Sequence, residues 1–215
     1  MGGLALVLGS HARHLDPSAG EWTALLRHGE PGYALPHEID NVGNMRRLVD
    51  AGCDRVLAIG SVGALRPELG PGTFVCPEDF IALYAPPMTA LDGVAAHTVP
   101  RFDPDWRSQV VTTLRDAGTQ VRDGGVYWQA TGPRLETAAE IRLISEHAEV
   151  IGMTVASECV AAGELGLRYA AVCLVDNFAN GVAETELSMA ELEVTRAANV
   201  AALDAALAGA LPELA

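Results

Sequence analysis

The stretch that decides the fold starts with YWQATGPRLETAAE (residues 127–140) and continues through VIGMT (150–154) to CLVDNFAN (173–180). Each run begins with apolar, strand-like residues and ends in a polar or glycine-rich turn, and a helix pattern closely follows the first two. In an open α/β sheet, such strand ends line the crevice that holds a ligand. The turns carry Glu136, Met153, Thr154 and Asp176. The stretch therefore predicts a polar-edged pocket for a small heterocycle.

Outward from this stretch, strand and helix patterns alternate along the whole chain. We predict strands at 4–8, 55–59, 73–76, 149–153 and 168–175, one long strand or a strand pair at 121–130, and helices at 38–51, 104–117 (capped by Asp103), 137–147, 157–165 and 188–207. Prolines and glycines between 82 and 100 indicate a long irregular loop. This alternation predicts one α/β domain spanning residues 1–215, with a mostly parallel or mixed twisted β-sheet covered by helices on both faces.

Composition excludes several classes of function. The formal net charge is -14 and the 14 basic residues are scattered, so we expect no nucleic-acid partner. The four cysteines and six histidines show no metal-binding spacing, which predicts reduced, buried thiols, a cytoplasmic protein and no metal. The apolar run at 4–8 is too short to cross a bilayer, so we expect no membrane partner.

Polar residues after several strands could together form an anion site. They are Ser10, Arg27, His28, Ser61 and Thr154. A tetrahedral oxyanion needs convergent donors, which arginine, hydroxyl groups and backbone amides supply. Alternatively, the hydroxyl residues only cap helices and Arg27 is a solvated surface charge. The glycine spacings of phosphate-binding loops and dinucleotide folds are absent, so a nucleotide cofactor is not indicated.

A second group of residues could surround a planar ring. Leu135, Met153 and Phe178 could sandwich it, although each could equally belong to the core. Glu136 and Asp176 are carboxylates at strand ends, where burial is costly unless they bind something. Alternatively, Glu136 interacts with a helix dipole and Asp176 forms a turn.

Several of these motifs together resemble the family of trimeric nucleoside phosphorylases, which includes purine nucleoside phosphorylase and methylthioadenosine phosphorylase. The signature is GPRLETAAE (132–140) followed by Gly152-Met153-Thr154, and the similarity extends to residues 158–170, 60–72 and 27–29. The resemblance implies a nucleoside phosphorylase-like fold and phosphorolysis of a purine nucleoside to free base and ribose 1-phosphate. It implies inorganic phosphate as co-substrate and no metal or organic cofactor.

The resemblance also implies roles for individual residues. Ser10, Arg27, His28, Ser61 and Thr154 match phosphate-binding positions, and the nucleoside-binding set comprises Leu135, Glu136, Met153, Asp176, Phe178 and His97. Within that set, Asp176 matches the catalytic residue that contacts purine N7 and assists the leaving group. Leu135 replaces a Phe that stacks on the purine. His97 matches a residue that reaches the sugar 5′ end in a neighbouring subunit, which implies a homotrimer or a dimer of trimers.

The base and the sugar remain open at this stage. Glu136 resembles the residue that reads N1 of 6-oxopurines, whereas Asp176 is typical of enzymes for 6-aminopurines, and Phe178 occupies the position of a second Asp in the latter. The sugar could carry a 5′ modification, as in methylthioadenosine. Two alternatives remain beside phosphorolysis: a nucleoside hydrolase-like member that uses water, and a non-catalytic or specialised nucleoside-binding homologue.

Overall fold

The computed structural model describes residues 2–12, 20–183 and 189–215. The strands of this part are β1 (Gly3–Leu8), β2 (Trp22–Leu26), β3 (Cys53–Ala64), β4 (Phe74–Cys76), β5 (Asp79–Ile81), β6 (Val121–Asp123), β7 (Val126–Gln129), β8 (Val150–Gly152) and β9 (Arg168–Phe178). The α-helices are α1 (Asn41–Asp50), α2 (Pro104–Asp116), α3 (Ala138–Ile144), α4 (Val155–Glu164) and α5 (Met189–Leu214), with short 3-10 turns at Ser10–Ala12, Pro36–Glu38 and Gly93–Ala96.

All nine described strands form one mixed sheet in which β3 and β9 run side by side through the middle. The order is β5-β7-β8-β3-β9-β4-β6, and β1 pairs with β3 and carries β2 at its other edge. β3 is parallel to β1 and β9 but antiparallel to β8, and β4 is antiparallel to β9. The predicted α/β fold with a mixed sheet is therefore confirmed.

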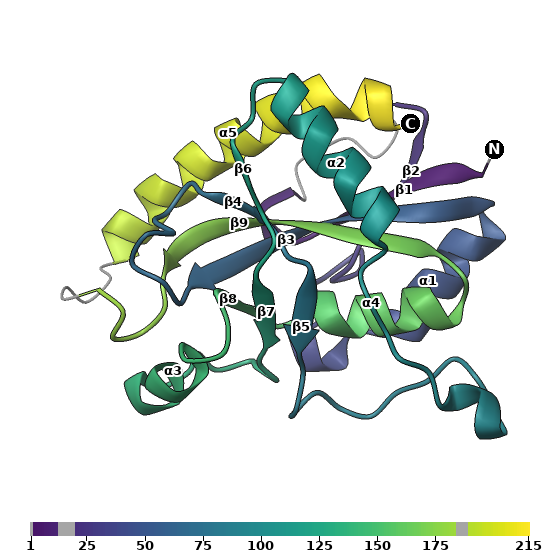
Figure 1. Ribbon diagram of the computed structural model, residues 1–215, viewed down its shortest axis with the longest axis horizontal. Coiled ribbons are helices and arrows are strands. Elements are labelled where there is room, and N and C mark those ends of the chain that lie inside the picture. Colours follow the sequence, from purple (N-terminus) through teal and green to yellow (C-terminus); the bar gives the residue numbers. More distant parts are fainter. Residues whose placement is uncertain (1, 13–19, 184–188) are drawn as a thin grey trace.

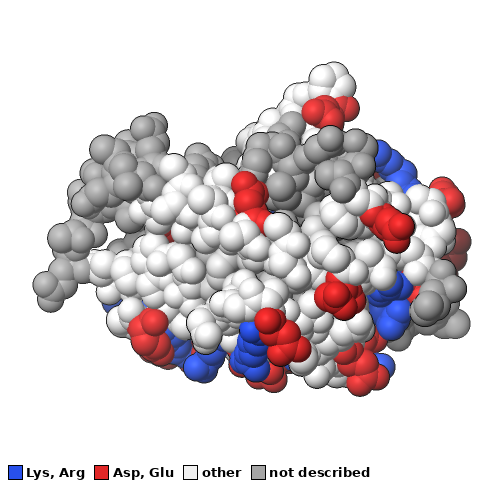
Figure 2. Space-filling view, turned by 90° about the horizontal axis from the view of Figure 1, so that it is seen from above, with Lys and Arg blue, Asp and Glu red and all other residues white. Residues whose placement is uncertain are grey.

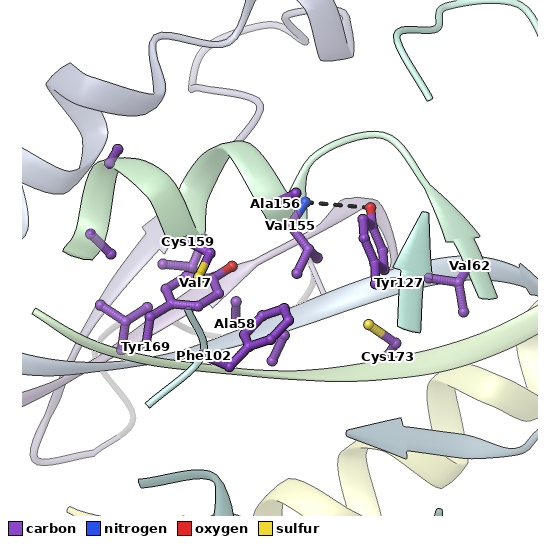
Figure 3. Close-up of a cluster of buried hydrophobic side chains, with 14 of the residues drawn as sticks. Val7, Ala58, Val62, Phe102, Tyr127, Val155, Ala156, Cys159, Tyr169 and Cys173 are labelled. Carbon is purple, nitrogen blue, oxygen red and sulfur yellow. Dashed lines mark hydrogen bonds between the residues drawn. The ribbon is translucent and has the colours of Figure 1, made fainter. Parts of the chain in front are cut away.

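Helices cover both faces of the sheet, with α2 and α5 on one face and α1 and α4 on the other (Figure 1). Beneath α2 and α5, a buried cluster includes Leu57, Trp106 and Leu203. The cluster on the α4 face includes Tyr127, Phe102 and other buried side chains (Figure 3). The sheet is thus buried on both sides, which explains why its central strands read as continuous apolar runs.

Most predicted elements are present, with boundaries that the tertiary structure moves. β3 does not end at residue 59 but continues through Ser61 to Ala64, because β9 pairs with it along most of its length and β8 pairs with its last residues. The predicted strand region 121–130 forms two strands that do not pair with each other, since Gly124 and Gly125 adopt positive φ and break the run. The predicted start of the last helix, Ser188, lies outside the described residues.

Helix starts follow local capping chemistry. The Asp103 side chain accepts a hydrogen bond of 2.8 Å from the backbone N–H of Trp106, which confirms the predicted cap of α2. α1 begins at Asn41 rather than near residue 38, because Asp40 caps it by accepting from the N–H of Gly43. Thr137 and Glu140 form a reciprocal capping box at the start of α3.

The surface over α5 and α2 carries few charges in its centre. On this face, Arg side chains are interspersed with Asp and Glu along one margin (Figure 2). Within the described residues, no helix is both long and apolar enough to span a membrane.

Candidate active site

A pocket of about 210 Å³ opens where β1, β2, β3, β8 and β9 end or bend. Its lining includes every residue predicted from the sequence except Asp176, Phe178 and His97: Ser10, Arg27, His28, Ser61, Leu135, Glu136, Met153 and Thr154. Tyr33, Gly63, Asn177 and Asn180 also line it. We call Ser10, Arg27, His28, Ser61 and Thr154 the anion end of the pocket, and Leu135, Glu136, Met153 and Asn177 the base end.

The buried carboxylate of Glu158 holds the Arg27 side chain in place. Its Nε and Nη2 donate to the two carboxylate oxygens of Glu158 at 2.6 and 2.9 Å, and its Nη1 donates to the carbonyl of Ile59 at 2.7 Å. The Tyr169 hydroxyl donates to Glu158 at 2.7 Å. Burial alone would lower the pKa of Arg27, but the Glu158 carboxylate outweighs it and raises the pKa above its usual value. Arg27 is therefore a charged donor held in one orientation.

The glycine before Ser10 makes room for this arginine. A Cβ at Gly9 would lie only 2.7 Å from Nη1 of Arg27 and 2.9 Å from the carbonyl oxygen of Ile59. The Gly9–Ser10 turn can thus lie directly against the guanidinium. Beside it, Nδ1 of His28 donates to the Ala34 carbonyl at 2.8 Å, and the imidazole stacks on Tyr33 with ring centroids 4.2 Å apart.

Thr154 lines the pocket from the N-cap position of α4. The buried hydroxyl of Tyr127 accepts from the backbone N–H of Thr154 at 3.2 Å. It also accepts from the N–H of Val155 at 3.4 Å (Figure 3). Gln129 accepts from the N–H of Ser157 at 3.0 Å, so β7 holds the first turn of α4 in place. A helix amino end favours negative charge through its dipole, so α4 adds to the anion end by its field and not through these N–H groups, which Tyr127 and Gln129 already bind.

The base end is built mainly on a loop. Leu135 is 69% exposed, whereas Glu136 is half-buried, and that burial raises the pKa of its carboxyl group, with Glu140 adding to the effect. Met153 lies against this loop, because a Cβ at Gly132 would come within 2.6 Å of its sulfur. Gly132 has a φ of +67°, which favours glycine for a second reason.

Asp176 lies behind the pocket wall rather than in the lining. Its carboxylate accepts from the hydroxyl of Ser61 and, at 2.8 Å, from the side-chain amide of Asn199 on α5. The cause is a bulge in the β3–β9 ladder: Val62 pairs with Val175 but Gly63 pairs with Asn177, which leaves Asp176 as the extra residue. The next residue, Asn177, therefore lines the pocket instead.

Phe178 and His97 also lie elsewhere. Phe178 packs against the core cluster that contains Tyr127, and a Cβ at Gly70 would lie 3.8 Å from its ring. His97 is exposed just after the 3-10 turn Gly93–Ala96, on a loop that also exposes Val94 and Val99. Neither side chain lines the pocket of its own chain.

The sequence prediction did not include Asn177, Tyr33, Glu158 or Asn199 among the site residues. Asn177 follows Asp176 directly, and only the bulge decides which of the two faces the ligand. Glu158 lies in the region that resembles the nucleoside phosphorylases and was expected on a helix. Its partner, Arg27, is 131 positions away in the sequence, and no local pattern reveals such a contact.

Comparison with known proteins shows the family to which the chain belongs. The sequence model of the phosphorylase superfamily matches residues 14–211. A probable 6-oxopurine nucleoside phosphorylase of Archaeoglobus fulgidus is 39% identical over 77% of this chain and 68% of its own length. A probable S-methyl-5′-thioinosine phosphorylase of Xanthomonas campestris is 34% identical over 88% of this chain and 76% of its own.

Solved structures give the same fold. A methylthioadenosine phosphorylase from Schistosoma mansoni in complex with adenine superposes with a TM-score of 0.85 at 19% identity, covering 100% of this chain and 92% of that one. The chain belongs to the phosphorylase superfamily, with the nucleoside phosphorylase fold that the sequence motifs implied.

Proposed function

We propose that the protein catalyses the phosphorolysis of a 6-oxopurine nucleoside. In this reaction a phosphate oxygen bonds to C1′ of the ribose while the bond from C1′ to purine N9 breaks, and the electron pair of that bond leaves with the base. The products are the free base and ribose 1-phosphate. Family membership and the names of the relatives support a purine nucleoside phosphorylase.

The anion end is the proposed phosphate site. Arg27, His28, Ser10 and Thr154 converge there from three segments, and Thr154 stands at the amino end of α4. Phosphate held beneath the sugar needs no activation by a metal, because the reaction depends on placing it next to C1′ and on stabilising the departing base. Phosphate as co-substrate and the absence of a metal or organic cofactor remain predictions.

The base end supports the 6-oxopurine assignment. Nδ2 of Asn177 donates one hydrogen to the carbonyl of Phe178 at 2.7 Å, and we expect its other hydrogen to be donated to N7 as negative charge develops on the leaving base. We expect the carboxylate of Glu136 to accept from N1–H, which a 6-oxopurine has and a 6-aminopurine lacks. With a 6-aminopurine, the Glu136 oxygens would face the lone pair of N1, which is unfavourable. The sequence suggested Asp176 for the contact with N7, but the lining of the pocket favours Asn177.

The observation that carries the proposal is the convergence in one pocket of Arg27 and the hydroxyl donors with Asn177 and Glu136. Leu135 and Met153 would contact the faces of the base and ribose. A homotrimer, or a dimer of trimers, remains our proposal for the assembly. The exposed position of His97 beside Val94 and Val99 supports it, because that loop is free to reach a neighbouring subunit. A cytoplasmic location remains a prediction, supported by the four free cysteines.

A substrate panel tests the proposal. Inosine, guanosine, methylthioinosine, adenosine and methylthioadenosine are incubated with the protein, with and without phosphate, and base release is followed. We expect release from the 6-oxopurine nucleosides only when phosphate is present. Equal release without phosphate would indicate a hydrolase, and binding without turnover would indicate a nucleoside-binding protein. Preference for adenosine would overturn the assignment of Glu136 and Asn177.

A further inference from the structure

The hydrogen bond between Ser61 and Asp176 fixes which way the Ser61 hydroxyl points. A carboxylate has no proton to give, so Ser61 must donate its single hydroxyl proton to Asp176. Ser61 nevertheless lines the pocket, while Asp176 is 6% exposed. The Ser61 oxygen therefore presents only lone pairs to a ligand. Within the anion end, the Ser61 hydroxyl therefore acts as a hydrogen-bond acceptor toward a ligand, whereas the other groups there can donate.

A separate hydrogen bond from Asn199 holds the second carboxylate oxygen of Asp176, so the orientation of this carboxylate is fixed. Asn199 on α5 donates from Nδ2 to Oδ1 of Asp176 at 2.8 Å and to the carbonyl of Val175 at 3.0 Å. Asn199 is 2% exposed, so these bonds do not compete with solvent. The other oxygen, Oδ2, is the one that accepts from Ser61.

We propose that Asp176 is a specificity-determining positioning residue, which acts through Ser61 to select a tetrahedral oxyanion that carries a proton. This inference rests on the proposed phosphate site. Hydrogen phosphate and sulfate are both dianions of similar size, but only hydrogen phosphate has an O–H group. Bound in the anion end, its O–H donates to Ser61, whereas a sulfate oxygen would face the Ser61 lone pairs with no hydrogen between them. This missing hydrogen bond should make sulfate bind much more weakly than hydrogen phosphate.

The negative charge of Asp176 does not itself explain such selectivity. Repulsion from a carboxylate acts on both dianions alike, so it cancels when the two are compared. The ratio of their affinities therefore isolates the hydrogen-bond polarity of Ser61.

The test measures the dissociation constants of inorganic phosphate and sulfate by calorimetry at about pH 8, where phosphate is mainly a dianion. We expect the wild-type protein to prefer phosphate by about 10- to 100-fold. In Asp176→Asn, the Asn199 amide still needs an acceptor, so the new amide directs its oxygen to Asn199 and its NH2 to Ser61. Ser61 then accepts from residue 176 and donates to the pocket. The preference should fall to within about threefold, mainly through tighter binding of sulfate.

Two further variants keep the test decisive if Asp176→Asn does not fold. Ser61→Ala removes the acceptor and its bond to Asp176 but keeps the carboxylate, and the preference should again fall. If Ser61 instead donated to the anion, its loss would weaken the binding of both anions equally and leave the ratio unchanged. Asn199→Ala disturbs the same cluster but leaves the Ser61–Asp176 bond, so the ratio should be retained.

Each outcome has a distinct meaning. If the wild-type protein binds phosphate and sulfate equally, or if Asp176→Asn keeps the wild-type ratio, the inference about Asp176 is overturned while the phosphate site stands. If neither anion binds, the proposed phosphate site fails and the inference fails with it.

Discussion

The two ends of the pocket are built in different ways. At the anion end, polar groups lie on or directly after strands and are held by buried partners, as Arg27 is by Glu158 and Ser61 by Asp176. At the base end, Leu135 and Glu136 lie on the loop between β7 and α3, and Leu135 is 69% exposed. The difference indicates that the residues which place the nucleophile need rigid support, whereas those that read the base tolerate change. The predictions below test that contrast, in order of decreasing effect.

Removal of the donor to the leaving base should have the largest effect. Asn177→Ala should lower kcat on inosine by about 100- to 1000-fold, the usual cost of losing one donor to developing negative charge. Asp176→Asn should retain kcat within about tenfold at saturating phosphate, because Asp176 does not line the pocket. A larger loss from Asp176→Asn than from Asn177→Ala would show that Asp176 contacts the purine after all.

The buried ion pair between Arg27 and Glu158, which supports the anion end, should contribute strongly to the free energy of unfolding. Glu158→Ala leaves the buried charge of Arg27 without its partner, so the free energy of unfolding should fall by about 3–5 kcal/mol in urea titrations. The control is Glu140→Ala, which removes a solvent-exposed ion pair with Arg134 and the Glu140 half of the α3 capping box. Its effect should be much smaller, because water screens that pair and the cap lies at the surface. Equal losses in the two variants would contradict the contrast between the ends.

A substitution at the base end should be able to strengthen the binding of the nucleoside. Leu135→Phe offers an aromatic face to the purine and should lower KM for inosine by about two- to tenfold, as expected for one added aromatic contact. Leu143→Phe is the matched control, since Leu143 is similarly exposed at 61% but lies on α3 and lines a different groove. It should leave KM unchanged, and an equal improvement there would mean that Leu135 does not contact the base.

The smallest effect should come from the helix that follows the base-end loop. Thr137→Ala removes the cap of α3 and should cost about 1 kcal/mol in unfolding free energy. Thr112→Ala, at an exposed position inside α2, provides the control. We expect no loss there, since alanine is a better helix former than threonine. If Thr112→Ala costs as much as Thr137→Ala, the capping box contributes nothing measurable.

The fold was predictable because its strands are apolar runs ending at glycine or polar turns, and local chemistry such as the Asp103 cap marks the helix starts. Most of the predicted site residues do line the pocket, since Ser10, Arg27 and Thr154 follow strands whose carboxyl ends meet. What the sequence could not supply depends on distant pairing. The bulge opposite Val62 and Gly63 exchanges Asp176 for Asn177 at the pocket, and no periodicity within either strand reveals it.

The most direct test of the account is ³¹P nuclear magnetic resonance of the protein with inosine and phosphate. We predict that the phosphate resonance decreases as a ribose 1-phosphate resonance grows, in equal amount to the hypoxanthine released. Hypoxanthine released with no new phosphorus resonance would mean that water is the nucleophile and would contradict the account.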